Sequence, residues 1–218
     1  MVESENITFH YFAGLNARAG IARALLSYGK IAYTAKNYTF DEWASVKPSM
    51  EFGQLPVMEI NDVQYSQSNA IFVYLARRLN LLGNSAEDLH SILSLLGSND
   101  DLIPKALPFL FPRTDDQKAN IEVNMKSFLE FAVPHLKAYE SRASKNGGKF
   151  MVGDGFSLAD IFVSVMHRQI FAHPLREQAF LQTFIDTCPT VYAIALAVEQ
   201  NELKDFFNGG GWVAEAPF

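Results

Sequence analysis

The chain has 218 residues, of which 18 are Lys or Arg and 24 are Asp or Glu, so its formal net charge is −6. This acidic balance argues against a nucleic-acid surface. No apolar run approaches the roughly 18 residues that span a bilayer, and residues 1–5 are too polar for a signal peptide. A single cysteine, Cys188, excludes an internal disulfide and suits a reducing compartment. We therefore expect a soluble, cytoplasmic protein with no membrane span.

The first 80 residues predict a mixed α/β domain. Alternating apolar and polar positions predict four short strands, at 7–12, 32–38, 57–60 and 63–66. Apolar residues at helical spacing predict two helices, at 17–28 and 68–79. Asn61 and Asp62 predict a hairpin turn, and residues 39–53 are expected to be mostly loop. The resulting order is β-α-β followed by β-β-α.

After a linker at 81–84, residues 85–218 predict an all-helical second domain. The expected helices run over 86–111, 114–144, 157–173, 175–187 and 190–207. Pro104 and Pro108 predict a bend in the first of these helices. Capping boxes predict helix starts at Thr114 and Ser157, and three glycines at 209–211 predict a flexible tail.

Ser68 begins the helix expected over 68–79 and predicts a site for an anion. A serine that caps a helix offers its hydroxyl and leaves the first backbone N–H groups free beside the positive end of the helix dipole. A carboxylate is a suitable ligand there. An ordinary cap without a ligand is the alternative interpretation.

Residues 43–56 carry groups that suit an extended peptide. Leu55 precedes Pro56 at a strand start. In a cis peptide bond, the N–H and C=O of Leu55 would face outward and pair with a peptide as an added strand does. Trp43 and Lys47 could bring an indole N–H and an ammonium group to a second carboxylate. A packed tryptophan and a solvated lysine are the alternative.

Tyr11 ends the first strand and is the candidate for handling a thiol. A free thiol titrates near pH 8.5, so only a few per cent is thiolate at neutral pH. Lowering that pKa by about two units needs roughly 2.7 kcal/mol, and one hydrogen bond to a charged acceptor contributes about 1.5–3 kcal/mol. One well-placed hydroxyl therefore suffices. The alternative is that Tyr11 is an ordinary packing residue.

Several short motifs follow one another along the chain: Tyr11-Phe12, Arg18-Ala19, Trp43, Lys47-Pro48, Phe52-Gly53-Gln54-Leu55-Pro56-Val57, Gln67-Ser68-Asn69-Ala70-Ile71 and Ser157-Leu158-Ala159-Asp160. In this order they resemble the cytosolic glutathione transferases, and most of all the sigma class, which includes haematopoietic-type prostaglandin D synthases. The resemblance covers the whole chain. It implies a thioredoxin-like domain over 1–80, an all-helical C-terminal domain, a homodimer, and glutathione as co-substrate with no metal.

The resemblance also implies a role for each site residue. Tyr11 would hydrogen-bond the glutathione sulfur, and Arg18 would raise the local positive potential. The rest of the peptide would be held by Trp43 and Lys47 at the glycine carboxylate, Gln54, Leu55 and cis Pro56 at the cysteinyl backbone, and Gln67 and Ser68 at the γ-glutamyl end. A hydrophobic electrophile would be bound by Phe12, Gly14, Leu15, Ile103 and Leu107.

The chain departs from the family pattern at three places. The loop at 13–17 is one residue longer than usual, and Gly20 replaces a glutamate. Gly97 stands where the family often offers an aspartate to the glutathione of the partner subunit. Either Ser98 or Asp100 compensates for this change, or the affinity for glutathione is lower.

The predicted function is therefore a glutathione transferase that activates the thiol through Tyr11 for attack on hydrophobic electrophiles. The alternatives are a glutathione-dependent prostaglandin-type isomerase, and a non-catalytic glutathione-binding or structural protein like the lens S-crystallins. Cys188 predicts a buried structural thiol, since no second cysteine is present for redox chemistry. The five histidines show no metal-binding spacing: His10, His90, His135, His167 and His173.

Overall fold

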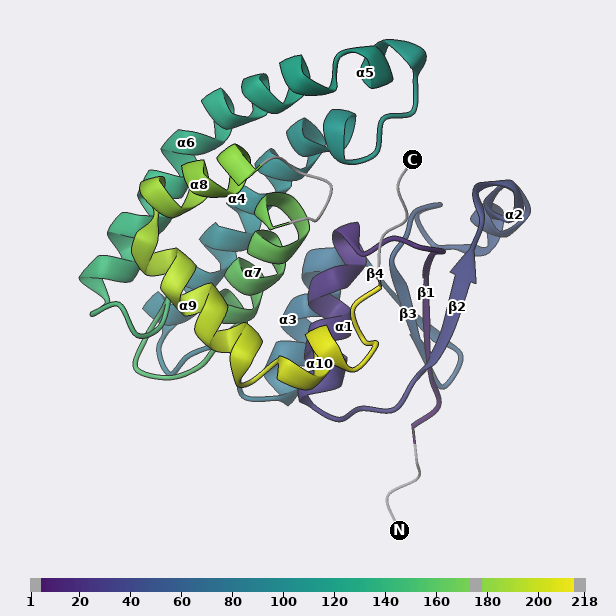
Figure 1. Ribbon diagram of the computed structural model, residues 1–218. Helices are drawn as coiled ribbons and strands as arrows, with labels where there is room; N and C mark the ends of the chain where they lie inside the picture. The colour runs from purple at the N-terminus through teal and green to yellow at the C-terminus, as the bar shows by residue number, and fades with distance from the viewer. Residues whose placement is uncertain (1–4, 173–177, 214–218) are drawn as a thin grey trace. The chain divides into compact units, whose positions relative to one another are not determined.

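The computed structural model describes residues 5–172 and 178–213 in two compact units (Figure 1). The first unit holds residues 5–81 and 199–213, and the second holds residues 82–198. The sequence predicts a helical domain over 85–218, whereas residues 199–213 group with the first unit. The helix end expected at His173 and Pro174 lies outside the described residues.

The first unit contains a four-stranded mixed sheet. Its strands are β1 (Ile7–Phe12), β2 (Thr34–Tyr38), β3 (Val57–Ile60) and β4 (Val63–Ser66), in the order β2-β1-β3-β4. β1 pairs with β2 in parallel and with β3 antiparallel, and β3 pairs antiparallel with β4. Asn61 and Asp62 both have positive φ, as the predicted hairpin turn requires. The four predicted strands are thus confirmed, with β2 starting two residues later than expected.

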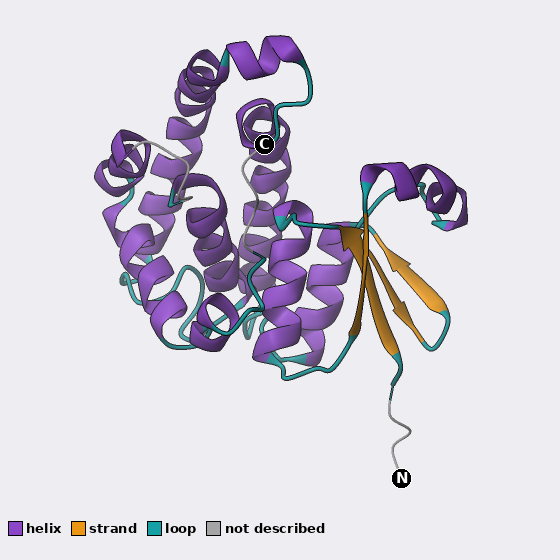
Figure 2. Cartoon of the chain, turned by 45° about the vertical axis from the view of Figure 1, so that its right-hand side comes forward, coloured by secondary structure: helices purple, strands orange, loops and turns teal. Residues whose placement is uncertain are grey.

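Helices cover one face of this sheet (Figure 2). The helical segments of the first unit are η1 (Ala17–Ala19), α1 (Gly20–Tyr28), α2 (Phe40–Val46), η2 (Lys47–Ser49), α3 (Ser68–Arg78) and α10 (Lys204–Asn208). α1 and α3 pack side by side, and α10 packs on α1. Phe9, Leu25 and Phe72 are among the side chains buried in the core.

The helix α2 corrects the prediction of a loop over 39–53. Thr39 accepts a hydrogen bond from the N–H of Glu42, and the Glu42 carboxylate accepts one from the N–H of Thr39. This reciprocal pair is a capping box, which starts a helix by satisfying two N–H groups that lack partners. The motif was visible in the sequence as Thr39 followed three residues later by Glu42.

A buried histidine links three strands on the other face of the sheet. His10 on β1 contacts the Tyr38 hydroxyl through Nδ1 at 2.7 Å and Glu59 through Nε2 at 3.0 Å. Burial lowers the pKa of His10, so the ring is neutral at pH 7. Because a carboxylate only accepts, Nε2 carries the proton and Nδ1 accepts from Tyr38. The three side chains therefore hold β2, β1 and β3 in register.

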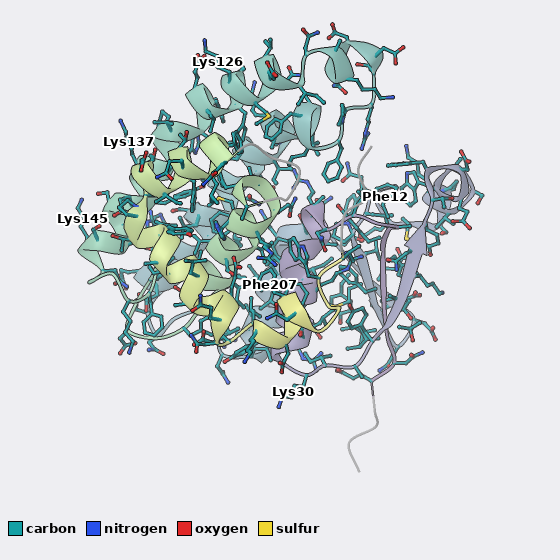
Figure 3. The ribbon with its side chains drawn as sticks, viewed as in Figure 1. Phe12, Lys30, Lys126, Lys137, Lys145 and Phe207 are labelled. Carbon is teal, nitrogen blue, oxygen red and sulfur yellow. The ribbon has the colours of Figure 1, made fainter. Side chains whose placement is uncertain are left out.

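The second unit is entirely helical. Its segments are α4 (Ala86–Leu110), α5 (Asp115–Ala119), α6 (Ile121–Lys145), α7 (Leu158–Met166), the π-helical η3 (His167–Phe171), α8 (Gln178–Thr187) and α9 (Pro189–Gln200), whose last two residues belong to the first unit. α4 packs along α6, and Lys126 and Lys137 of α6 point away from the unit (Figure 3). Phe128 and Phe171 lie at the centre of a cluster of phenylalanine rings.

The structure corrects two predicted helices and the predicted flexible tail. The capping box at Thr114 is present but starts only the short α5, because the helix is interrupted at Asn120 before α6 begins. The helix expected over 190–207 divides into α9 and α10. The glycines at 209–211 are not a loose tail: the Trp212 N–H donates to the carbonyl of Phe206 at 2.8 Å, and the two rings pack edge to face.

The capping box at Ser157 is confirmed and buried. Oδ2 of Asp160 accepts from the N–H and the hydroxyl of Ser157 at 2.9 and 2.8 Å, and Oδ1 accepts from the N–H of Met151 at 2.7 Å. Burial raises the pKa of Asp160 to about 6, so the carboxylate is still ionised at pH 7. One side chain therefore starts α7 and ties it to the preceding loop.

Asp160→Ala should destabilise the protein by about 3 kcal/mol or more, because it leaves three buried donors without an acceptor. Chemical denaturation at pH 7 measures this loss. Asp154→Ala is the matched control, since Asp154 is exposed and accepts one hydrogen bond, from Asn84. We expect the control to cost less than about 1 kcal/mol. Equal losses in the two variants would contradict the role of Asp160.

Candidate active site

The strand register brings three separate segments to one end of the sheet. His10 of β1 lies opposite Val57 of β3, and Val57 lies opposite Ser66 of β4. Tyr11 follows directly after His10, Pro56 directly precedes Val57, and Gln67 directly follows Ser66. These predicted site residues from three parts of the sequence therefore meet at the same edge.

Tyr11 is buried, with 4% of its surface exposed, and its hydroxyl has a defined partner. The backbone N–H of Arg18 donates to the Tyr11 hydroxyl oxygen at 3.0 Å. A hydroxyl that accepts a hydrogen bond is polarised and becomes a stronger donor through its own proton. The hydroxyl is thus suited to donate to an anionic sulfur.

The resemblance implies that Arg18 provides the positive charge near Tyr11, and the structure adds a second arginine, Arg23. The guanidinium carbon of Arg23 lies 5.6 Å from the centroid of the Tyr11 ring. Arg23 is 4% exposed, in the middle of the apolar helix α1. A charged side chain is rarely buried without a specific role, so this position was the signal in the sequence for Arg23.

Trp43 and Lys47 lie on and after α2. The Trp43 ring packs edge to face against Phe12 at 5.6 Å, which places it beside the end of β1. Lys47 is exposed, and its side chain runs over Gly53, where an added Cβ would lie 3.3 Å from the lysine Cε. Gln64 of β4 holds the segment between Lys47 and Gly53, because its side-chain nitrogen donates to the carbonyl of Ser49 at 3.0 Å. Nothing in the sequence around Gln64 indicates this role.

The Leu55–Pro56 peptide bond is cis, as the resemblance implies. Gln54 lies just before it and meets Gln67, whose side-chain nitrogen is 3.5 Å from the Gln54 oxygen. Gln67 has φ 69° and ψ 116°, a backbone conformation that residues other than glycine rarely adopt. Such strained residues cluster at ligand sites.

The structure corrects the position of Ser68 by one residue. The residue that caps α3 is Gln67, which makes no side-chain capping hydrogen bond, and Ser68 is the first residue of the helix. The positive φ of Gln67 turns the chain sharply into the helix, so the cap falls one residue earlier. The first N–H groups of α3 still lack acceptors within the helix, and Ser68 is 7% exposed among them. The predicted anion site therefore keeps its electrostatic basis.

Comparison with known proteins gives the family. A family profile described as the glutathione S-transferase N-terminal domain matches residues 7–77, and the corresponding C-terminal profile matches residues 100–208. The chain belongs to the glutathione S-transferase family. The family uses glutathione as its co-substrate.

Individual relatives agree with this assignment. The chain is 31% identical to glutathione S-transferase 2 of Manduca sexta over 150 residues, which cover 67% of this chain and 70% of the relative. It is 27% identical to S-crystallin SL11 of Nototodarus sloanii over 175 residues, covering 80% and 82%. The solved structure of a Fasciola hepatica sigma class GST shares the fold, with a TM-score of 0.75 at 21% identity over 99% of this chain and 100% of that one.

The residues predicted to bind an electrophile divide between the two units. Phe12 and Leu15 flank the exposed Gly14, which has φ +72°, in the first unit. Ile103 and Leu107 lie one turn apart on α4 in the second unit, Ile103 buried and Leu107 half-buried. In this transferase the Phe12 ring packs edge to face on the Tyr11 ring at 5.6 Å, and Gly14 and Leu15 follow in the loop after β1.

The departure at Gly97 is not compensated by Ser98. The Ser98 hydroxyl lies 2.7 Å from both His135 Nδ1 and the Tyr139 hydroxyl, so it is engaged within the helical unit. Gly97 itself is exposed on α4, with no atom within 4 Å of an added Cβ. Compensation by Asp100 and a lower affinity for glutathione remain the two alternatives.

Cys188 is the buried thiol that the sequence predicts. Its side chain has no exposed surface and donates to the carbonyl of Phe184 at 3.1 Å. Burial raises its pKa to about 12, so the thiol is not a nucleophile at neutral pH.

The described residues contain no cluster suited to a metal ion and no single helix that could span a membrane. In residues 5–172 and 178–213, no group of three or more His, Cys, Asp or Glu side chains is placed to hold a metal ion. No single helix in these ranges is long and apolar enough to cross a membrane. Residues 180–200 of α8 and α9, bent by 110° at their junction, pass this test only as a pair.

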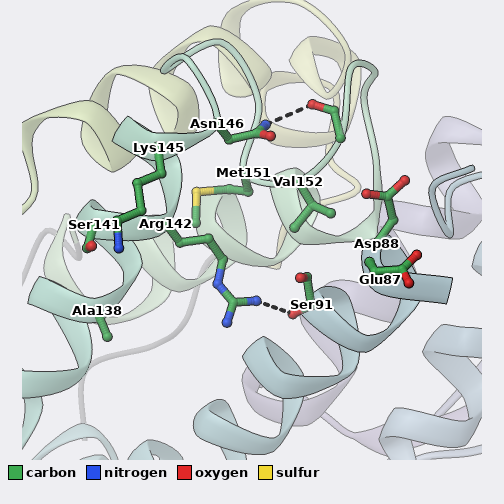
Figure 4. Close-up of a pocket in the computed structure, with 11 residues that line it drawn as sticks. Glu87, Asp88, Ser91, Ala138, Ser141, Arg142, Lys145, Asn146, Met151 and Val152 are labelled. Atoms are coloured by element: carbon green, nitrogen blue, oxygen red, sulfur yellow. Dashed lines mark hydrogen bonds between the residues drawn. The ribbon is translucent and has the colours of Figure 1, made fainter. Parts of the chain in front are cut away.

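The helical unit also contains a pocket of about 510 Å³ between the start of α4 and the end of α6 (Figure 4). None of the predicted site residues lines it. Its acidic wall, Glu87 and Asp88, is in the first turn of α4, and its basic wall, Arg142 and Lys145, is in the last turn of α6. Charges of these signs stabilise the corresponding ends of helix dipoles, and Arg142 also binds the carbonyl of Ser91 at 2.7 Å. The charges on the pocket walls are therefore accounted for by the helix ends.

Gln67→Gly should stabilise the unliganded protein by about 1 kcal/mol, because glycine adopts a positive φ without the cost that Gln67 incurs. Chemical denaturation without ligand measures the change. Gln67→Ala is the matched control, since it removes the same side chain but keeps the strained Cβ, and it should give no gain. The strain at Gln67 would be refuted if both variants had the same stability.

Proposed function

We propose that this transferase uses the Tyr11 hydroxyl to stabilise the thiolate of glutathione, which then attacks a hydrophobic electrophile. The observation that carries the proposal is the meeting of Tyr11, Pro56 and Gln67 at one end of the sheet. That end offers a polarised hydroxyl, the backbone of Leu55 at a cis peptide bond before β3, and a helix amino terminus within one unit. These are the groups that a short peptide with a thiol and a carboxylate would need.

Electrostatics support Tyr11 as the activating group. Its hydroxyl accepts from Arg18 and its ring faces Arg23, so both neighbours favour negative charge at this place. A hydrogen bond from a hydroxyl to an anion contributes about 1.5–3 kcal/mol, which lowers a thiol pKa by roughly one to two units. The thiolate fraction at neutral pH then rises by about tenfold or more.

The remaining site residues are proposed to hold the peptide in an extended form. The γ-glutamyl carboxylate would bind at the start of α3, through Ser68 and Gln67, because the helix dipole favours an anion there. The Leu55 backbone would pair with the cysteinyl residue beside Gln54. Trp43 and Lys47 would bind the glycine carboxylate.

In the reaction, the thiolate sulfur forms a bond to the electrophilic carbon and the leaving group departs with the electron pair. Proximity contributes as well, since both reactants are held at one site. Phe12, Gly14 and Leu15 would contact the electrophile, and Ile103 and Leu107 would complete its pocket from the helical unit. We also propose a sigma-like class and a cytosolic location.

Tyr11→Phe should lower turnover of glutathione with 1-chloro-2,4-dinitrobenzene by about 10- to 100-fold, because it removes one hydrogen bond to a charged acceptor. Glutathione affinity should change little, since the peptide contacts remain. Spectrophotometry of the conjugate and calorimetry measure the two quantities. Tyr33→Phe is the matched control, because it also removes one tyrosine hydroxyl. Tyr33 lies just before β2, at the end of that strand away from the site, whereas Tyr38 at the other end pairs with Phe12.

The outcomes separate the candidate functions. Glutathione binding with turnover of prostaglandin H2 instead of the chloroarene would favour the isomerase. Glutathione binding without turnover of either substrate would favour a binding or structural protein like an S-crystallin. A protein that binds no glutathione would contradict all three.

We further propose a homodimer. Large apolar side chains are exposed on each unit, including Phe52 at 56% on the first and Leu93 at 44% on the second. Burying such side chains against a second copy would remove apolar surface from water. Sedimentation analysis should give a mass of about two chains, and Phe52→Ser should shift the protein toward the monomer. A wild-type monomer at micromolar concentration would contradict the proposal.

A further inference from the structure

The loop that follows Tyr11 is held by a buried asparagine. Asn16 has no exposed surface. Its side-chain nitrogen donates to the carbonyl of Val213 at 2.7 Å, and its side-chain oxygen accepts from the N–H of Val213 at 3.3 Å. One amide thus pairs with both backbone groups of a residue 197 positions away, as a neighbouring strand would.

The backbone of the same residue starts the turn that carries Arg18. The carbonyl of Asn16 accepts from the N–H of Ala19 at 2.6 Å and from that of Gly20 at 3.0 Å. These bonds form η1, and η1 aims the N–H of Arg18 at the Tyr11 hydroxyl at 3.0 Å. The orientation of Asn16 therefore affects the direction of the hydrogen bond that polarises Tyr11.

Arg23 holds the other side of the loop. Its Nη1 donates to the carbonyl of Leu15 at 2.6 Å and approaches the Asn16 oxygen at 3.4 Å. Its Nη2 donates to the side chain of Asn37 at 3.2 Å. The guanidinium thereby joins α1, the loop and β2 while its charge faces the Tyr11 ring.

Residues 209–213, the C-terminal segment, are also held through Trp212, independently of Asn16. Trp212 packs on the rings of Phe206 and Phe207, and its N–H donates to Phe206. α10, which carries both phenylalanines, packs on α1. Val213 therefore directly follows a residue that is packed on α10.

We propose that Asn16 is a positioning residue for Tyr11: by clamping Val213 to the loop, it holds the Arg18 N–H on the Tyr11 hydroxyl and so strengthens that hydroxyl as a donor to the glutathione sulfur. The proposal rests on the proposed function of Tyr11. It means that residues 209–213 contribute to the activation of the thiol. It also gives the one-residue-longer loop a purpose, because the loop supplies the asparagine that reaches Val213.

The direct test measures the ionisation of bound glutathione. The ultraviolet absorbance of the thiolate is titrated with pH in the complex of glutathione with wild type and with Asn16→Ala. We expect the pKa of the bound thiol to rise by about 0.5–1 unit, which means three- to tenfold less thiolate at pH values below that pKa. kcat with 1-chloro-2,4-dinitrobenzene should fall by the same factor at pH 6.5 and recover at alkaline pH. The KM for glutathione should stay within about twofold.

A truncation tests the same clamp from the other side and covers the case in which Asn16→Ala does not fold. Deleting residues 213–218 removes the partner of Asn16 and should reproduce the rise in pKa. Deleting only residues 215–218 is the matched control, because it keeps the Val213 peptide groups, and it should leave the pKa unchanged. The double variant, Asn16→Ala with residues 213–218 deleted, should shift the pKa no further than either change alone.

The results distinguish this proposal from the proposed function. If wild type binds glutathione with a lowered thiol pKa, but that pKa stays within about 0.2 unit in both altered proteins, Asn16 does not act on Tyr11. Additive shifts in the double variant would also overturn the clamp. If wild type binds no glutathione, the proposed function fails together with this inference.

Discussion

The site depends above all on the position of β1 at the centre of the sheet. β1 pairs in parallel with β2 on one side and antiparallel with β3 on the other, and β4 continues the sheet from β3. This arrangement brings the end of β1, the start of β3 and the end of β4 to one edge, where Tyr11, Pro56 and Gln67 lie. Because strand residues alternate between faces, a slip of one residue would move Tyr11 from the helix-covered face to the opposite one.

Buried polar groups keep that register more specifically than apolar packing does. On one face, His10 is bonded on one side to Tyr38 and on the other to Glu59, each in a different strand. On the other face, Arg23 binds the loop after β1 and Asn37 of β2. A misregistered sheet would leave these groups buried without partners, at a cost of about 1–3 kcal/mol each. The same contacts that define the fold thus bring Tyr11 and its neighbours together.

The local elements of this structure were largely predictable. The strands, the hairpin at Asn61 and the cap at Ser157 follow from patterns within about ten residues of one another. The differences are also local in kind: α2 begins at a capping box at Thr39 within the stretch expected to be loop, and the box at Thr114 starts a helix that stops at Asn120. Gln67, with its positive φ, displaced the cap of α3 from Ser68. A backbone angle of that kind leaves no trace in residue type when the residue is not glycine.

By itself, the sequence determined the element order and the family motifs, and it made Tyr11 the candidate for activating a thiol, because each of these depends on neighbours along the chain. Only the tertiary structure decided which groups surround that hydroxyl. The guanidinium over its ring comes from Arg23, and the loop beside it is held by Val213, 197 residues after Asn16. Such partners are chosen by burial: an amide or a guanidinium removed from water must bond whatever the folded chain brings within reach.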